Sequence, residues 1–195
     1  GRGQQIRAGI AEARAPWLLV LHSDTELQSG WEDEVSAFMR SVVLGQSDKA
    51  AAAFRYALDD VGIMPRLVET IVHLRSNFAK LPYGDQALLI PRRLHDEIGG
   101  YKPMPILEDV EFIRRLGRRR LSILKSGALT SSERYRSEGY LRRVARNQVC
   151  LLMYAWGAPV EHIADYYKAP PKTSEAAPEM SDTAAKSAAH NIKPS

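Results

Sequence analysis

The chain has 195 residues, 45% of them hydrophobic and 26% charged, with a formal net charge of +4. This composition is ordinary for a globular domain with one sizeable core, and the modest charge favours anionic partners only weakly. No apolar run is long enough to span a bilayer, and no secretory signal opens the chain. The single cysteine, Cys150, excludes an intrachain disulfide and is interpreted as a buried thiol in a reducing, cytoplasmic setting.

The apolar pattern of the first third of the chain predicts alternating helices and strands. Residues 4–14 are expected to form an amphipathic helix, and the continuous apolar run 17–21 a strand buried on both faces, as inside a parallel sheet. Ser29 is expected to cap a helix that ends near Gly45. The alternating residues 50–58 predict a strand that is antiparallel or at a sheet edge.

The next predicted helix begins near Pro65, which suits a first helical turn. Its apolar face is made of Leu67, Ile71, Leu74 and Phe78. His73, between apolar positions, is interpreted as structural. The pattern then predicts a strand at 87–90, a short helix at 91–98, a helix at 108–117, a short strand at 121–124, and helices at 140–156 and 160–167. Residues 169–195 hold almost no large apolar side chains and are expected to be a disordered tail.

Polar motifs stand where ligands commonly bind. His22 and Asp24 follow a predicted buried strand, and ligands of open α/β sheets bind outside the carboxyl ends of strands. An imidazole and a carboxylate at that edge suit a divalent cation held together with phosphate oxygens, whereas a plain polar turn is the simpler interpretation of the motif alone. Glu108 and Asp109 begin a helix, where acidic residues are also expected for dipole reasons.

In combination, the motifs resemble family 2 glycosyltransferases with the GT-A fold, and among them the bacterial transferase 2 proteins associated with radical-SAM and selenium-domain genes. The similar segments are Gly1-Arg2-Gly3-Gln4-Gln5, His22-Ser23-Asp24-Thr25, Tyr83-Gly84-Asp85-Gln86, Gly99-Gly100-Tyr101 and Leu107-Glu108-Asp109-Val110-Glu111. They extend over everything but the tail. His22 replaces the first aspartate of the family's DxD motif, as is usual in the subgroup, so Asp24 is the only carboxylate there.

The resemblance implies a fold and a domain division. Residues 1–168 are expected to form a glycosyltransferase-like catalytic domain, an α/β three-layer sandwich around a mixed, mostly parallel sheet. The family's first βαβ unit, which carries early carboxylates for the nucleobase, is expected to precede Gly1. The sheet is therefore expected to have an open edge or a missing strand pair.

The resemblance also implies a reaction, the inverting transfer of a sugar from a nucleotide-sugar donor to an unidentified acceptor. Asp109 is then the candidate base, Glu108 orients Asp109 or the acceptor, and Asp24 with His22 holds Mg²⁺ or Mn²⁺ against the leaving diphosphate. The implied substrate-binding residues are Arg2, Gln5, Tyr83, Asp85, Gln86 and either Arg114 or Arg115.

A second interpretation is not enzymatic. The chain is then a truncated or degenerate transferase domain that binds a protein partner or an anionic surface through its arginines. Nucleic acid is not an expected partner, because the arginines are not interleaved with aromatic residues at a recognisable spacing. The expected location is cytoplasmic, with peripheral contact at the inner membrane face through the arginine-rich segments left open. The donor sugar, the acceptor and the oligomeric state stay open as well.

Overall fold

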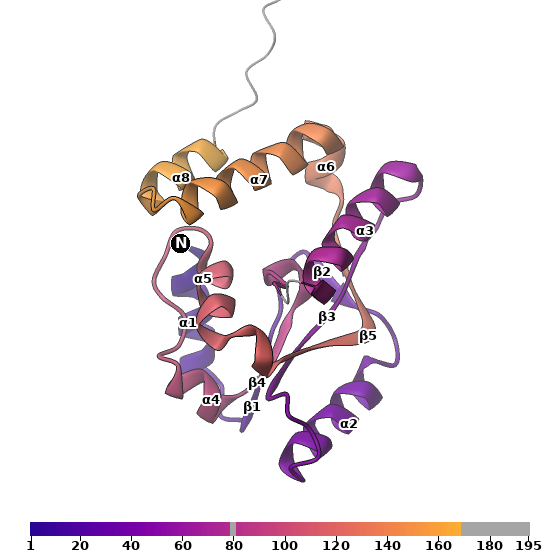
Figure 1. Ribbon diagram of the computed structural model, residues 1–195, viewed down its shortest axis with the longest axis vertical. Coiled ribbons are helices and arrows are strands. Elements are labelled where there is room, and N and C mark those ends of the chain that lie inside the picture. Colours follow the sequence, from indigo (N-terminus) through magenta and orange to yellow (C-terminus); the bar gives the residue numbers. More distant parts are fainter. Residues whose placement is uncertain (79–80, 169–195) are drawn as a thin grey trace, which may run out of the picture.

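The computed structural model describes residues 1–78 and 81–168. A five-stranded sheet of order β1-β4-β3-β5-β2 forms the centre of these residues (Figure 1). The strands are β1 (Trp17–Val20), β2 (Thr25–Leu27), β3 (Ala51–Leu58), β4 (Leu88–Pro91) and β5 (Leu121–Thr130). The predicted tail lies outside the described residues. Among the described helices, none is long and apolar enough to cross a membrane.

The sheet is mixed, but the expectation that it is mostly parallel is wrong for the described strands. Only β3 and β5 run parallel, whereas β4 runs against both β1 and β3, and β2 runs against β5. The reason lies in the turn η1 (Gly84–Gln86), which packs where β3 and β5 end: the Gln86 side chain binds the Phe54 carbonyl, and the Thr130 hydroxyl donates to the Asp85 carbonyl. The chain therefore enters β4 from that end and runs back against β3.

Two strand environments also differ from the sequence-based predictions. β1 is an edge strand of the described sheet, so that Leu18 is buried but Leu19 is exposed, and it is not covered on both faces. β3 lies between β4 and β5: it runs antiparallel to β4, as one of the two predicted alternatives has it, but it is not at an edge, and residues 51–54 are fully buried. A run of apolar residues reveals that a strand is buried somewhere but not which neighbours it has.

Helices cover both faces of the sheet and give three layers. On one face lie α1 (Arg2–Glu12), α4 (Arg92–Glu97) and α5 (Glu108–Leu116), and on the other α2 (Trp31–Val43) (Figure 1). Ile90 packs toward the first group with Phe112, whereas its neighbour Leu89 packs toward Val35 of α2, as alternation along a strand requires. The predicted cap of α2 is wrong by one residue, because Gly30, not Ser29, occupies the N-cap position, and no side chain caps it.

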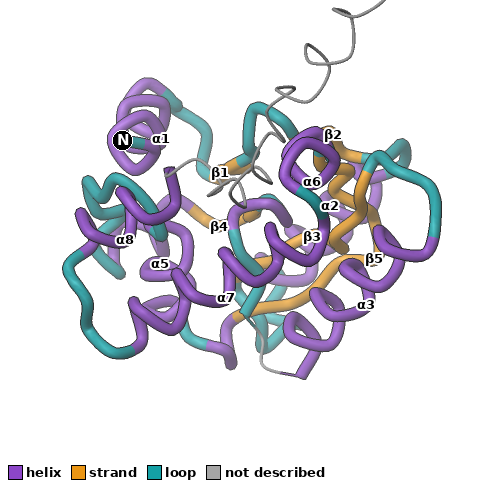
Figure 2. Tube along the Cα trace, turned by 90° about the horizontal axis from the view of Figure 1, so that it is seen from above, coloured by secondary structure: helices purple, strands orange, loops and turns teal. Residues whose placement is uncertain are grey.

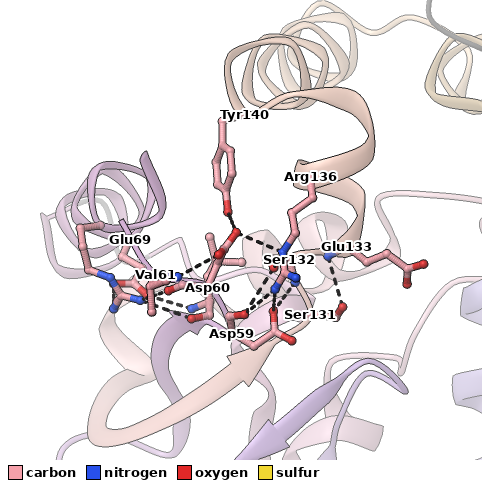
Figure 3. A network of polar contacts seen from close by, with 11 residues as sticks. Asp59, Asp60, Val61, Glu69, Ser131, Ser132, Glu133, Arg136 and Tyr140 are labelled. Atoms are coloured by element: carbon pink, nitrogen blue, oxygen red, sulfur yellow. Dashed lines mark hydrogen bonds and ion pairs between the residues drawn. The ribbon is translucent and has the colours of Figure 1, made fainter. Parts of the chain in front are cut away.

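The remaining helices gather at the end of the sheet where β3 and β5 finish (Figures 1 and 2). These helices are α3 (Ile63–Phe78), α6 (Glu133–Glu138), α7 (Tyr140–Ala155) and α8 (Val160–Lys168). A polar network around the turn after β3 fastens α6 and α7 there (Figure 3). Asp59 accepts a hydrogen bond from the Ser132 backbone at 2.6 Å, and Asp60 accepts from the Tyr140 hydroxyl at 2.6 Å and from Arg136 at 3.2 Å.

The apolar face predicted to pack α3 is largely exposed. Its members Leu67, Ile71, Leu74 and Phe78 have exposed fractions of 47%, 44%, 53% and 82%. Val68 and Val72, at 4% and 8%, pack instead against Tyr56 and Leu58. The helix carries two apolar stripes, and the sequence alone does not say which of them meets the sheet. His73 is structural as predicted, since its Nε2 lies 2.9 Å from the Tyr56 carbonyl.

β5 is longer than the predicted short strand at 121–124. It continues to Thr130 because Glu34 of α2 accepts hydrogen bonds from the backbone N–H groups of Lys125 and Ser126, both at 2.8 Å. The pairing of β3 with β5 is irregular at the same level, between Ala53 and Arg55. With these hydrogen bonds, β5 extends to the end of the sheet at which the polar sequence motifs lie.

Candidate functional site

A cavity of about 190 Å³ lies at the end of the sheet where β3 and β5 finish. Its polar wall combines side chains from four separate segments: Arg2 at the start of α1, His22 and Asp24 after β1, Asp85 in η1, and Asp109 at the start of α5. Tyr83 also lines this cavity. The structure therefore brings together most of the residues that the sequence motifs single out.

Gly84 is the point where two of these segments touch. Its backbone N–H donates to Oδ2 of Asp109 at 2.5 Å. A Cβ atom at this position would lie 2.9 Å from the same oxygen and would collide with Nε2 of His22. The absence of a side chain at Gly84 thus allows the imidazole of His22 and the carboxylate of Asp109 to approach the same turn.

The backbone leading into the site is strained. Leu107, directly before α5, has φ 61° and ψ 21°, and Ala87, directly after η1, has φ 49°. They are the only residues other than glycine with positive φ in the described part of the chain. This left-handed region costs a β-carbon-bearing residue free energy, and such strain is concentrated at functional sites. The turn at Leu107 places Glu108 and Asp109 in the molecule's interior, where both are buried.

Two further carboxyl groups near Asp109 are held in unusual electrostatic surroundings. Burial, with the nearby Asp109 carboxylate as a further cause, raises the pKa of Asp85 to about 6. Burial and Asp109 likewise raise the pKa of Glu108, although Arg2 opposes the shift by donating to Glu108 at 2.9 Å. Asp85 Oδ1 and Glu108 Oε2 are buried and have no hydrogen-bond partner among the described residues. Groups of this kind are typical of sites that bind or transfer protons.

His22 and Asp24 fit a cation that the protein holds only in part. Burial lowers the pKa of His22, and the positive charge of Arg2 adds to this effect, so that the neutral imidazole, which can bind a metal, is favoured. Within residues 1–78 and 81–168, no group of three or more metal-binding side chains is arranged to hold an ion. Mg²⁺ in phosphate-binding sites commonly takes one or two protein ligands and completes its shell with substrate oxygens and water. The donor set fits that type of site.

Three of the residues expected to bind substrate lie elsewhere. Gln86 is fully buried, and its amide is occupied by Ser76 at 2.7 Å and by the Phe54 carbonyl at 2.9 Å. Arg115 binds Glu111 at 2.6 Å and the Gly100 carbonyl at 2.7 Å. Arg114 lies 5.0 Å from the centre of the Tyr154 ring. None of the three lines the cavity, because Gln86 links η1 to α3 and β3, Arg115 is bound to the turn after α4, and Arg114 lies beside α7.

A second cavity of about 530 Å³ adjoins the first. It lies between α1 and β1, and Gln5 and Leu19 line it. The two cavities share Arg2, His22, Asp24 and Arg134. Gly3 of α1 is buried and packs against the backbone of residues 102–104.

The sequence motifs do not point to two arginines of the site, Arg75 and Arg134. The guanidinium of Arg75 lies 3.9 Å from the centre of the Tyr83 ring, and its Nη2 is buried without a hydrogen-bond partner among the described residues. Arg134 follows β5 by four residues and belongs to both cavities. A prediction that β5 ends at Thr130 would have placed Arg134 at the ligand-binding edge, whereas no sequence signal marks Arg75.

No protein family model matches this chain, and no curated protein sequence matches it. The case for the site therefore consists of its own geometry. Segments far apart in the sequence place carboxylates, an imidazole and arginines around the junction of two cavities.

Proposed function

We propose that this chain carries the acceptor site and the catalytic carboxylates of an inverting glycosyltransferase with the GT-A fold, which uses a nucleotide-sugar donor. The observation that carries the proposal is that the DxD-like pair, His22 and Asp24, lies where the two cavities meet and lines the smaller one together with Asp109. The larger cavity is assigned to the donor and the smaller one, which contains Asp109, to the acceptor. The motif resemblance supports the proposed transferase, and the three-layer α/β architecture is compatible with it.

The reaction needs a base on the acceptor side. The acceptor hydroxyl oxygen attacks the anomeric carbon from the face opposite the diphosphate and forms the new C–O bond. The bond between that carbon and the diphosphate oxygen breaks, and its electron pair leaves with the nucleoside diphosphate. The hydroxyl proton passes to Asp109. The backbone N–H groups of Gly84 and Val110 donate to the two oxygens of Asp109, so the carboxylate is fixed in orientation.

Positive charge is available where the diphosphate would leave. Arg2 and Arg134 border both cavities, and the buried carboxylate of Glu108 fixes Arg2 through an ion pair at 2.9 Å. Asp24 and His22 would hold Mg²⁺ or Mn²⁺, which, when bound, neutralises charge on the leaving group. Fixed charges directed at developing negative charge commonly provide a large part of catalysis.

The test is to screen nucleotide sugars for turnover with Mn²⁺ and to compare wild type with Asp109→Asn. If Asp109 takes the acceptor proton, the substitution slows turnover by about 10²-fold or more, the usual scale for general base catalysis. Asp33→Asn is the matched control, because Asp33 is also an aspartate in a first helical turn but is exposed on α2. Equal turnover in wild type and Asp109→Asn would contradict the proposal. Anion binding without turnover that survives loss of both Asp24 and Asp109 would favour the non-enzymatic binding module.

A further inference from the structure

The smaller cavity has an apolar half that sugar chemistry alone does not explain. From the polar wall it extends into a gap between α3 and α7, which Val72 of α3 and Val144 of α7 both line; the two side chains belong to one apolar cluster. Val68 and Leu151 add further aliphatic surface to the lining. A small polar acceptor would make no use of such a wall, since burial of apolar surface stabilises binding only when the ligand is apolar too.

The gap opens on the exposed stripe of α3, defined as Ile63, Leu67, Ile71, Leu74 and Phe78. Ile71 belongs to both, because it lines the cavity and is 44% exposed. The stripe occupies one face of the helix, with successive members four, four, three and four residues apart. Contiguous apolar surface of this kind marks interaction sites. Ile71 thus joins the apolar part of the cavity lining, which Asn147 and Gln148 of α7 interrupt, to the exposed stripe on the surface of the molecule.

A positive charge stands between the polar and the apolar halves. Arg75 lines the cavity beside Tyr83 and Asp85, and its buried Nη2 has no hydrogen-bond partner among the described residues. A buried guanidinium N–H group without an acceptor is costly, and a phosphate oxygen would satisfy it with a charge-assisted hydrogen bond.

The gap is a built feature of the fold. Both of its helices are fastened to the turn at Asp60: Arg66 of α3 donates to the Asp60 carbonyl at 2.6 Å, and Tyr140 of α7 donates to the Asp60 carboxylate at 2.6 Å (Figure 3). The spacing of α3 and α7 is therefore set by the polar network and not by apolar packing alone.

From these observations we infer that the acceptor is an amphiphile, with an anionic head group near Arg75 and an apolar chain in the gap between α3 and α7. The chain leaves the cavity past Ile71 and onto the exposed stripe. The inference rests on the proposed function, because it names the substrate class of the same acceptor site.

The test uses butyl phosphate and octyl phosphate, with inorganic phosphate as the head group alone. Affinities are measured by calorimetry, with octyl phosphate kept below its micelle-forming concentration. Each fully buried methylene contributes a factor of about four in affinity, so octyl phosphate is expected to bind at least about tenfold more tightly than butyl phosphate. Equal affinities for the two alkyl phosphates would overturn the inference.

Variants distinguish the contribution of the ligand's alkyl chain to affinity from that of its phosphate head group. Ile71→Asp should abolish the gain from the longer chain, and it should fold because Ile71 is partly exposed. Val43→Asp is the matched control: Val43 is 74% exposed on α2, at the opposite end of the molecule, and its replacement should preserve the gain. Arg75→Met should weaken inorganic phosphate and both alkyl phosphates by a similar factor, about tenfold, and leave the effect of chain length intact.

Other occupants of the stripe give different results. If Ile71→Asp preserves the chain-length gain but converts a dimer to a monomer in sedimentation, the stripe is a contact between two copies and the inference fails. It also fails if chain length has no effect while the protein binds phosphatidylglycerol vesicles in a manner that depends on Phe78. None of these measurements requires turnover. Equal alkyl phosphate affinities would leave the transferase proposal intact, and an active Asp109→Asn variant would leave the alkyl-chain site intact.

Discussion

Asp85 should make the folded state less stable as the pH rises from about 4 to 6. Its pKa is raised from the ordinary 3.8 to about 6, mainly by burial. Between these two values the folded state binds more protons than the unfolded chain, so the free energy of unfolding falls as the pH increases. The two pKa values differ by roughly two units, which corresponds to about 3 kcal/mol at 1.36 kcal/mol per unit. The protonated carboxyl group contributes this much to the free energy of unfolding at low pH, and the contribution is fully lost above about pH 6. Asn at this position cannot ionise and should not show the loss.

The experiment compares urea unfolding of wild type and Asp85→Asn at several pH values from 4 to 8, with EDTA present. The free energy of unfolding of Asp85→Asn, measured relative to wild type, should rise by about 2–3 kcal/mol between pH 4 and pH 7. This rise does not depend on how stable the variant is at pH 4. Asp165→Asn, which removes one exposed carboxylate from α8, serves as the control. A difference between Asp85→Asn and wild type that stays constant from pH 4 to pH 7 would refute the argument that burial penalises the ionised carboxyl group.

Two further predictions concern packing. Gly84→Ala should displace the Asp109 carboxylate, since the new methyl group would lie 2.9 Å from its Oδ2, and turnover should fall by tenfold or more while a thermal melt remains cooperative; wild-type turnover would show that the turn moves freely. Val72→Ala should cost about 2 kcal/mol because two buried methyl groups are lost, whereas Phe78→Ala should change stability by less than about 0.5 kcal/mol. Urea unfolding of both variants checks the assignment of the α3 faces, and the reverse order of the two effects would contradict it.

Much of the local structure follows from the sequence alone. The helix at residues 31–43 was predictable because its apolar stripe has a single face, and that face packs against the sheet. The motifs around Asp109 and around His22 and Asp24 were informative for a different reason. In the sequence only the family resemblance connects them, and the structure places Asp109, His22 and Asp24 at one cavity.

The tertiary structure decided what the periodicity leaves ambiguous. α3 has two apolar stripes, and the one with Val68 and Val72 is buried because it packs against Tyr56. The other stripe, which includes Phe78, therefore lies on the surface. The direction of the strands could not be predicted either, because an apolar run has the same pattern whether the neighbouring strands are parallel or antiparallel. Arg75 enters the site only through the way α3 lies across the end of β3. Sequence patterns report which residues avoid water, whereas the choice of partner depends on shape and on contacts between segments far apart in the chain.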